Sequence, residues 1–241
     1  MRSKSAAVAA VAVPLFAVAL AGCAFVPETV VQREDAVTEP VSAIEFELSN
    51  GRVEISVGDV EETTIERTLR YRGSLEREET TSFSGGTLRL EGCGRWCSVD
   101  YVIEVPAEVD VRGTTSSGRV VLAGVGDVEV RTDNGAIELD GVSGRVRAET
   151  SNGRIGGRAL AGGGVEASTS NGEIDLELAV PQPVDATTSN GEILLVVPPG
   201  SYRVDTDTSN GSVDVDIDAS DGGEFLLDLQ TSNGSITVRE E

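Results

Sequence analysis

Two cysteines that lie close together are the residues of this chain with the plainest chemistry. Cys93 and Cys97 are separated only by Gly-Arg-Trp, so a bond between them would close a small loop. In an oxidising compartment, a structural disulfide is the expected state of such a pair. The alternative is a redox-active pair, although the usual Cys-x-x-Cys motif is one residue shorter. A zinc site is not expected, because the chain contains no histidine and only three cysteines.

The third cysteine, Cys23, follows a segment typical of a lipoprotein signal peptide. Arg2 and Lys4 precede an uncharged apolar stretch, residues 6–21, which is shorter than the roughly 20 residues of a transmembrane helix. The Leu-Ala-Gly before Cys23 resembles a lipobox, whose cysteine receives a diacylglyceryl group and a further acyl chain such as palmitate. We therefore expect residues 1–22 to be removed and Cys23 to anchor the chain at the extracytoplasmic face of a cell membrane. The alternative is an ordinary secretory signal with a cysteine near the cleavage site.

The mature chain is expected to be strongly acidic. Removing the signal segment takes away two of the 19 basic residues, which leaves 17 arginines against 41 acidic residues and a net charge of −24. Such a surface repels phosphates, so no nucleic-acid partner is expected. It attracts cations, which include divalent metals, basic proteins and cationic peptides. The simpler explanation is that the charge keeps a repetitive β protein soluble and prevents edge-to-edge association.

A short repeated sequence, most often Thr-Ser-Asn-Gly, divides the chain into similar units. From Gly118 onward its glycines are 17, 18, 19, 19, 20 and 23 residues apart. Asn and Gly both tolerate a positive φ, so the Asn-Gly pairs are predicted to form structural corners between strands. The predicted corner residues are Asn50, Gly51, Gly118, Asn134, Gly135, Asn152, Gly153, Asn171, Gly172, Asn190, Gly191, Asn210, Gly211, Asn233 and Gly234.

The residues on both sides of each corner alternate between apolar and polar. Val165-Glu-Ala-Ser-Thr169 and Ile236-Thr-Val238 show this period of two, which is typical of strands with one buried face. An all-β parallel β-solenoid with coils of about 17–23 residues is predicted, because stacking explains why the same Thr and Asn recur at every corner. An antiparallel β-meander, with each Asn-Gly as a hairpin turn, is the alternative.

The sequence predicts three segments in the mature chain. Residues 23–42 contain two prolines and no pattern, and are predicted to form the lipid anchor and a flexible tether. Residues 43–110 are predicted to form a first coil and an irregular β cap with the disulfide loop, in which Trp96 has a packing role. Residues 111–241 are predicted to form the regular β-repeat array.

The repeated corners resemble those of the bacterial putative-adhesin, β-strand-repeat family of unknown function. The resemblance extends over residues 44–241 and includes Tyr101-Val-Ile-Glu-Val-Pro106 and the following Val109-Asp-Val111. It implies an exported β-repeat domain and, in some relatives, a link to adhesion or cell-envelope stress. The family has no established catalytic residues, so the resemblance assigns none here.

The sequence therefore favours a non-catalytic lipoprotein for interaction, adhesion or scaffolding at the cell envelope, with no cofactor. Its partner would be an envelope protein, a glycan or a cationic ligand. The alternative is an electrostatic trap or sensor for cationic peptides or metal ions in envelope stress. A polysaccharide-active enzyme is a third hypothesis, but the carboxylates follow the outward phase of the strands, as Asp214 and Asp216 do. Asp205 to Ser209 imitates the start of a calcium-binding EF-hand loop, although the glycine comes one residue late, at Gly211. No metal site is predicted.

Overall fold

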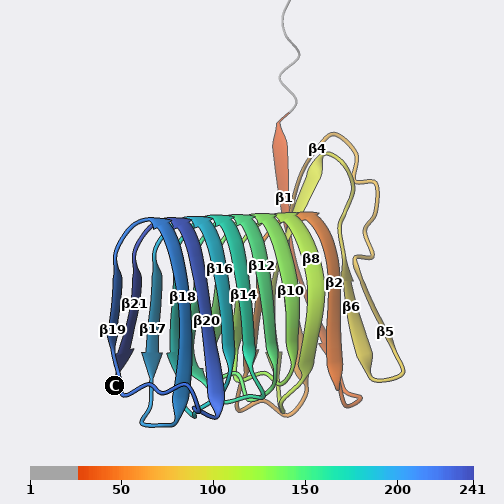
Figure 1. The fold of residues 1–241 in the computed structure, drawn as a ribbon. Coiled ribbons are helices and arrows are strands. Elements are labelled where there is room, and N and C mark those ends of the chain that lie inside the picture. Colours follow the sequence, from red (N-terminus) through yellow and green to blue (C-terminus); the bar gives the residue numbers. More distant parts are fainter. Residues whose placement is uncertain (1–26) are drawn as a thin grey trace, which may run out of the picture.

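Two β-sheets face each other and form a β-solenoid (Figure 1). The structure is a computed structural model that describes residues 27–241, so Cys23 and the predicted signal segment 1–22 lie outside the described residues. Within the repeat array, strands of successive coils lie parallel and in register. The parallel solenoid is therefore confirmed, and the antiparallel meander with Asn-Gly hairpins is wrong.

One strand of each coil belongs to a ten-stranded sheet and the other to an eleven-stranded sheet. In spatial order the ten-stranded sheet contains β18 (Tyr202–Asn210), β20 (Phe225–Asn233), β16 (Val184–Asn190), β14 (Val165–Asn171), β12 (Val146–Asn152), β10 (Val128–Asn134), β8 (Asp110–Ser117), β2 (Ala43–Asn50), β6 (Thr87–Glu91) and β5 (Thr81–Ser84). The eleven-stranded sheet contains β1 (Glu28–Val37), β4 (Thr63–Arg72), β7 (Cys97–Val105), β3 (Val53–Val57), β9 (Val120–Ala123), β11 (Ile137–Asp140), β13 (Ile155–Leu160), β15 (Ile174–Leu178), β17 (Ile193–Val197), β21 (Ile236–Glu240) and β19 (Val213–Asp216).

The core lies between the two sheets and consists of rows of apolar side chains. In each row one residue of a coil stacks on its equivalent in the next coil, as Ile155, Ile174 and Ile193 do. All three side chains are buried. Because strand side chains alternate between faces, the inward positions form this core and the intervening polar residues form the outer surface. β-Branched and Leu residues fill these positions, as is typical of half-buried strands.

The order of the coils in space differs from their order in the chain at both ends. The coil of β20 and β21 lies between the β16–β17 coil and the β18–β19 coil, so the last coil in sequence is not the last in space. Likewise, the β2–β3 coil, predicted as the first, pairs on one side with β8 and β9 and on the other with β6 and β7. The connection at residues 217–224 makes the first exchange possible, and it lies within the longest interval between corner glycines from Gly118 onward.

Residues 28–37 form strand β1, so the prediction of a flexible tether over residues 23–42 is wrong for this part. β1 pairs antiparallel with β4 along its whole length, from Glu28 opposite Arg72 to Val37 opposite Thr63. Arg67 of β4, whose side chain is nearly buried, forms an ion pair of 2.5 Å with Asp35 of β1. Most β1 side chains are exposed, so this edge strand is held mainly by backbone hydrogen bonds. A strand without a buried face lacks the apolar alternation by which sequence analysis finds strands.

Tyr101 of β7 is fully buried under the cap, and its hydroxyl lies 2.7 Å from the carbonyl oxygen of Thr80 and 2.8 Å from that of Glu91. The hydroxyl has one proton, which these two carbonyls share or accept in turn, and both carbonyls lie at the open end of the β5–β6 hairpin. Burial raises the pKa of Tyr101 to about 12, and the nearby hydrogen bonds and Arg67 oppose this rise only partly.

Tyr101 is expected to make the protein less stable at high pH. Its pKa in the folded state lies above the ordinary tyrosine value, so its contribution is complete below about pH 10 and is lost as the pH rises through 12. The expected loss is about 2 kcal/mol of unfolding free energy. Urea unfolding at pH 8 and above pH 11 measures it. The Tyr101→Phe variant should be less stable than the parent at pH 8, but its unfolding free energy should fall less from pH 8 to above pH 11. An equal fall in both proteins would contradict the role assigned to Tyr101.

Candidate interaction surfaces

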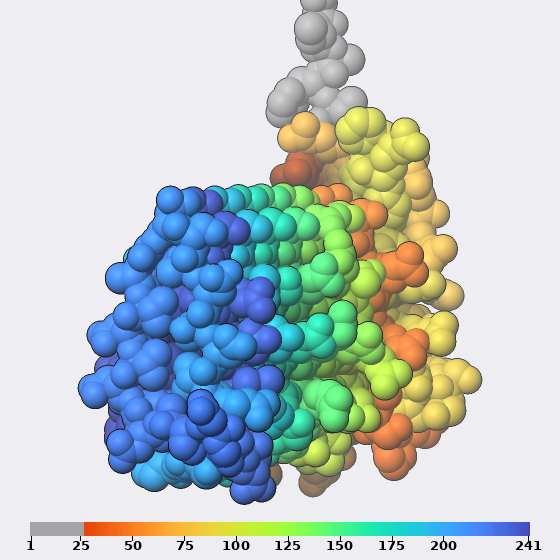
Figure 2. All heavy atoms as spheres, in the orientation of Figure 1, coloured from red at the N-terminus to blue at the C-terminus, as the bar shows by residue number. Residues whose placement is uncertain are grey.

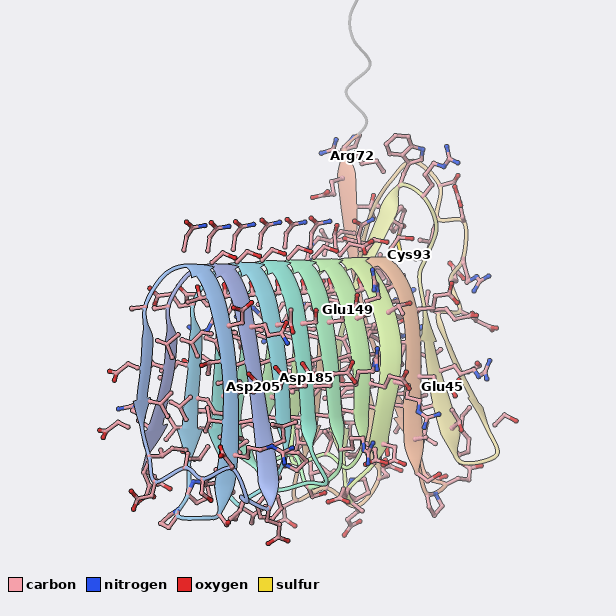
Figure 3. The ribbon with its side chains drawn as sticks, viewed as in Figure 1. Glu45, Arg72, Cys93, Glu149, Asp185 and Asp205 are labelled. Atoms are coloured by element: carbon pink, nitrogen blue, oxygen red, sulfur yellow. A yellow bond between two sulfur atoms is a disulfide. The ribbon has the colours of Figure 1, made fainter. Side chains whose placement is uncertain are left out.

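The predicted corner asparagines lie in one row along an edge of the solenoid (Figures 1 and 3). Five of the side-chain amides donate a hydrogen bond to the amide oxygen of the next asparagine, at 3.0–3.1 Å. The bonded row runs in spatial order through Asn210, Asn233, Asn190, Asn171, Asn152 and Asn134. Asn50 lies in register with this row but is separated from Asn134 by Ser117. The structure thus brings the predicted corner residues together as a ladder.

The corner glycines are needed because successive coils approach closely. A Cβ atom on Gly172 would lie 1.9 Å from the carbonyl oxygen of Gly153 in the neighbouring coil. The hydroxyl of Thr169 donates to the same oxygen at 3.2 Å. Gly135, Gly153, Gly191 and Gly211 show the same clash with an adjacent corner carbonyl.

The predicted reason for the corners, a positive φ, is wrong for most of them. Among the eight corner glycines, only Gly51, Gly118 and Gly234 have a positive φ, and no corner asparagine does. Stacking of the coils therefore selects glycine at the other five positions, and the side-chain ladder accounts for asparagine. Sequence alone could not separate these causes, because both place the same residue types at the same spacing.

Cys93 and Cys97 form a disulfide, with their Cα atoms 5.6 Å apart. The loop that they close connects β6 to β7, the last coil of parallel strands at the N-terminal end, beyond which lie β5 in one sheet and β4 and β1 in the other. It therefore occupies the place that an Asn-Gly corner takes in the regular coils. Trp96, within this loop, leaves 75% of its surface exposed, so the predicted packing role is wrong.

A row of charged residues crosses the outer face of the ten-stranded sheet (Figure 3). Its members lie in register on adjacent strands, in the order Arg89, Glu45, Arg112, Glu129, Arg147, Glu166, Asp185, Asp228 and Asp205. The first six alternate in sign, and their ion pairs include Arg89–Glu45 at 3.0 Å and Arg147–Glu166 at 2.8 Å. The last three are all carboxylates.

We call Asp185, Asp228 and Asp205 the acidic row. Adjacent strands are about 4.8 Å apart, and like charges directly opposite each other destabilise a sheet. Figure 3 shows Asp185 and Asp205 on this face toward the C-terminal end, with Glu45 at the other end. A shallow groove of about 500 Å³ runs along the charged row, between Arg112 and Asp228. This face is therefore balanced in charge at one end and negative at the other.

The C-terminal end of the solenoid has no further coil over it (Figure 2). Val213 and Val215 of β19 are 44% and 37% exposed, although Ile236 and Val238 in the same rows of the next coil are fully buried. Ala219 forms a single bridge with Tyr202 at the start of β18. Asp214 and Asp216 alternate with the two valines, an arrangement that discourages edge pairing with another acidic sheet.

Among residues 27–241, no three Cys, Asp or Glu side chains are arranged to hold a metal ion. Asp205 and Asp207, in the segment that imitates an EF-hand, lie on strand β18 and not in a loop. The part of the chain described also contains no helix long and apolar enough to cross a membrane.

Residues 107–239 match the family described as Toastrack DUF4097. The chain belongs to this family. Strands β1–β7 precede the matched Toastrack range, and so does the disulfide loop with Trp96. The Toastrack family is a domain of unknown function, and no catalytic family is indicated.

Solved structures similar to this Toastrack chain include three bacterial proteins. A putative adhesin from Bacteroides fragilis has 11% sequence identity and a TM-score of 0.48, with 88% of this chain and 97% of that chain covered. A putative adhesin from Parabacteroides merdae has 12% identity and a TM-score of 0.43, covering 88% and 96%. A putative cell adhesion protein from Clostridium sporogenes has 11% identity and a TM-score of 0.37, covering 88% and 100%. No curated protein matches the chain at a significant level.

Proposed function

We propose that the mature Toastrack chain is a lipid-anchored, non-catalytic module that binds a partner at the extracytoplasmic face of the cell envelope. The anchor is Cys23, after removal of residues 1–22. The partner is an envelope protein or glycan that lies across several coils of the ten-stranded sheet. Adhesion or scaffolding is the resulting activity.

The observation that supports this proposal best is the charged row on the outer face. Its residues are fixed to a rigid sheet at one level on nine adjacent strands, so they form a linear pattern that a partner can match. Three ion pairs join neighbouring residues in the part of the row that alternates in sign, from Arg89 to Glu166. The acidic row at the other end leaves carboxylates for a basic group on the partner.

The acidic row also supports the alternative, an electrostatic trap or sensor for cationic peptides or metal ions. Binding by charge alone weakens steeply as salt is added, because the Debye length falls from about 30 Å at 0.01 M to about 8 Å at 0.15 M. Binding by shape and hydrogen bonds weakens much less. Salt dependence therefore separates the two functions.

The test measures how strongly vesicles bearing the lipidated protein adhere to isolated cell envelopes, and how strongly the protein binds oligolysine. For a shape-specific module, envelope binding should fall less than about threefold between 0.01 and 0.15 M salt, and oligolysine binding should fall about tenfold or more.

The triple variant Asp185→Asn, Asp228→Asn and Asp205→Asn should weaken envelope binding. A control with three equivalent changes at exposed Glu61, Glu78 and Glu79 should not. Envelope binding that falls as steeply as oligolysine binding would favour the trap, and glycan turnover abolished by one carboxylate change would contradict both.

A further inference from the structure

One end of the cap projects beyond the row of corners, on the side where the chain enters the fold (Figure 1). This tip consists of residues 28–30 of β1, residues 70–74 at the end of β4 and residues 94–97 of the disulfide loop. Glu28 lies opposite Arg72, and Tyr71 lies opposite Cys97. The amide of Arg72 donates to the carbonyl oxygen of Trp96 at 3.4 Å. Three segments distant in sequence thus meet at the place where the chain begins its first strand.

The tip exposes two large apolar side chains, those of Trp96 and Val30, that lie outside the core. Trp96 is 75% exposed, and it is the only tryptophan in the chain. Val30, on β1 at the far side of β4 from the disulfide loop, is 55% exposed. Exposing an indole to water has a free-energy cost, whereas tryptophan is enriched where one side of a ring meets lipid and the other meets water.

The tip also contains three of the chain's arginines, Arg70, Arg72 and Arg95. Arg72, labelled in Figure 3, and Arg95 are exposed, and neither forms an ion pair with a carboxylate of the described residues. Arg70, two residues before Arg72, does form an ion pair, with Asp100. Two carboxylates lie close to the tip: Glu28 is opposite Arg72, and the side chain of Glu76 lies beside Gly94. Two cations beside an exposed indole suit the phosphates of lipid headgroups, in contrast to the acidic body.

The short connection to Cys23 decides which partner meets this tip. Only five residue steps separate Cys23 from Glu28, so an extended connection spans at most about 18 Å. Acyl chains on Cys23 would therefore hold the tip within this distance of the headgroups. We propose that the tip docks on the lipid surface, with Trp96 in the headgroup layer and Arg72 and Arg95 on lipid phosphates. This inference rests on the proposed lipid anchor.

This docking also fixes the orientation of the solenoid. The tip and the asparagine row lie on the same side of the molecule, so the corners face the membrane (Figures 1 and 3). The strands of both sheets then run away from the membrane surface, and the outer faces of the sheets, including the acidic row, remain accessible to partners. Repulsion between anionic headgroups and the acidic body keeps the body off the surface, so the tip makes the contact.

The single tryptophan makes the inference directly measurable. Cys23 is the one cysteine outside the disulfide, so the mature chain can be coupled through it to a maleimide lipid in phosphatidylglycerol-containing vesicles. The fluorescence of Trp96 should shift to shorter wavelength on coupling, and lipids brominated near the headgroup should quench it. Its quenching by acrylamide should fall about twofold or more, since the headgroup layer shields the ring.

Two matched variants separate specific docking from mere proximity. Arg72→Glu with Arg95→Glu should remove most of the quenching by brominated lipid. Arg203→Glu with Arg239→Glu changes the charge equally at the C-terminal end and should leave it intact. Fluorescence and acrylamide quenching equal in coupled and free protein would overturn the inference. Because the coupling is chemical, this result does not depend on lipidation in the cell, which the mass of the native protein tests separately.

Discussion

Replacing Gly172 by alanine is expected to lower the free energy of unfolding by about 3 kcal/mol or more. The added Cβ would lie 1.9 Å from the carbonyl oxygen of Gly153 and 2.6 Å from its carbon. Both are backbone atoms of the next coil, so no side chain can rotate away to relieve the contact. The coils must separate at this corner, which also breaks the hydrogen bond from Thr169 and the amide ladder at Asn171. Chemical denaturation monitored by circular dichroism measures the change.

Gly163→Ala is the matched control for this prediction. Gly163 lies in the turn opposite the corner, and a Cβ there would meet no atom within 4 Å. Its unfolding free energy should stay within about 0.5 kcal/mol of the parent value. Equal stability of the two variants would show that the coils are not stacked as closely as the structure has them.

Replacing Leu195 by alanine should have a comparable effect through the core. Leu195 of β17 is fully buried between Leu176 and Val238, which occupy the same row in the adjacent coils. Removing a fully buried leucine side chain leaves a cavity and usually lowers the unfolding free energy by 2–5 kcal/mol, so about 3 kcal/mol is expected. The same denaturation experiment measures it.

Val215→Ala provides the comparison at the open end of that row. Val215 stacks on Val238 but is 37% exposed, because no coil follows β19 in space. A loss below about 1 kcal/mol is expected for a valine that is only partly buried. If Val215→Ala proved as destabilising as Leu195→Ala, the C-terminal end would have to be covered in solution, for instance by a second copy.

The regular array could be predicted from the sequence because its inward rows and its corner rows repeat the same or similar residue types. Val, Thr, Asn and Ile recur at fixed distances from each corner glycine, and the structure places these equivalents in register on adjacent strands. Only stacking demands such repetition. The physical role of the glycines was not predictable, because close approach and positive φ select the same residue.

The ends of the solenoid were not predictable in the same way. The exchange of β20–β21 with β18–β19 leaves every row intact, so nothing in the repeat reveals it except the long interval before Gly234. The position of β1 depends on backbone pairing and on Asp35 meeting Arg67, a contact between residues far apart in sequence. The exposure of Trp96 follows from the place of the disulfide loop on the β6–β7 coil, next to β4 and β5, which the sequence does not give.

Intact-mass analysis of the full protein, extracted in detergent from a bacterial host, tests the central claim of a lipid-anchored envelope module most directly. We expect a mature chain that begins at Cys23 and has the added mass of a diacylglyceryl group and an acyl chain, and a Cys23→Ser variant without this mass. An unmodified chain that leaves the membrane fraction would contradict the anchor and the membrane-facing tip, although the solenoid itself would stand.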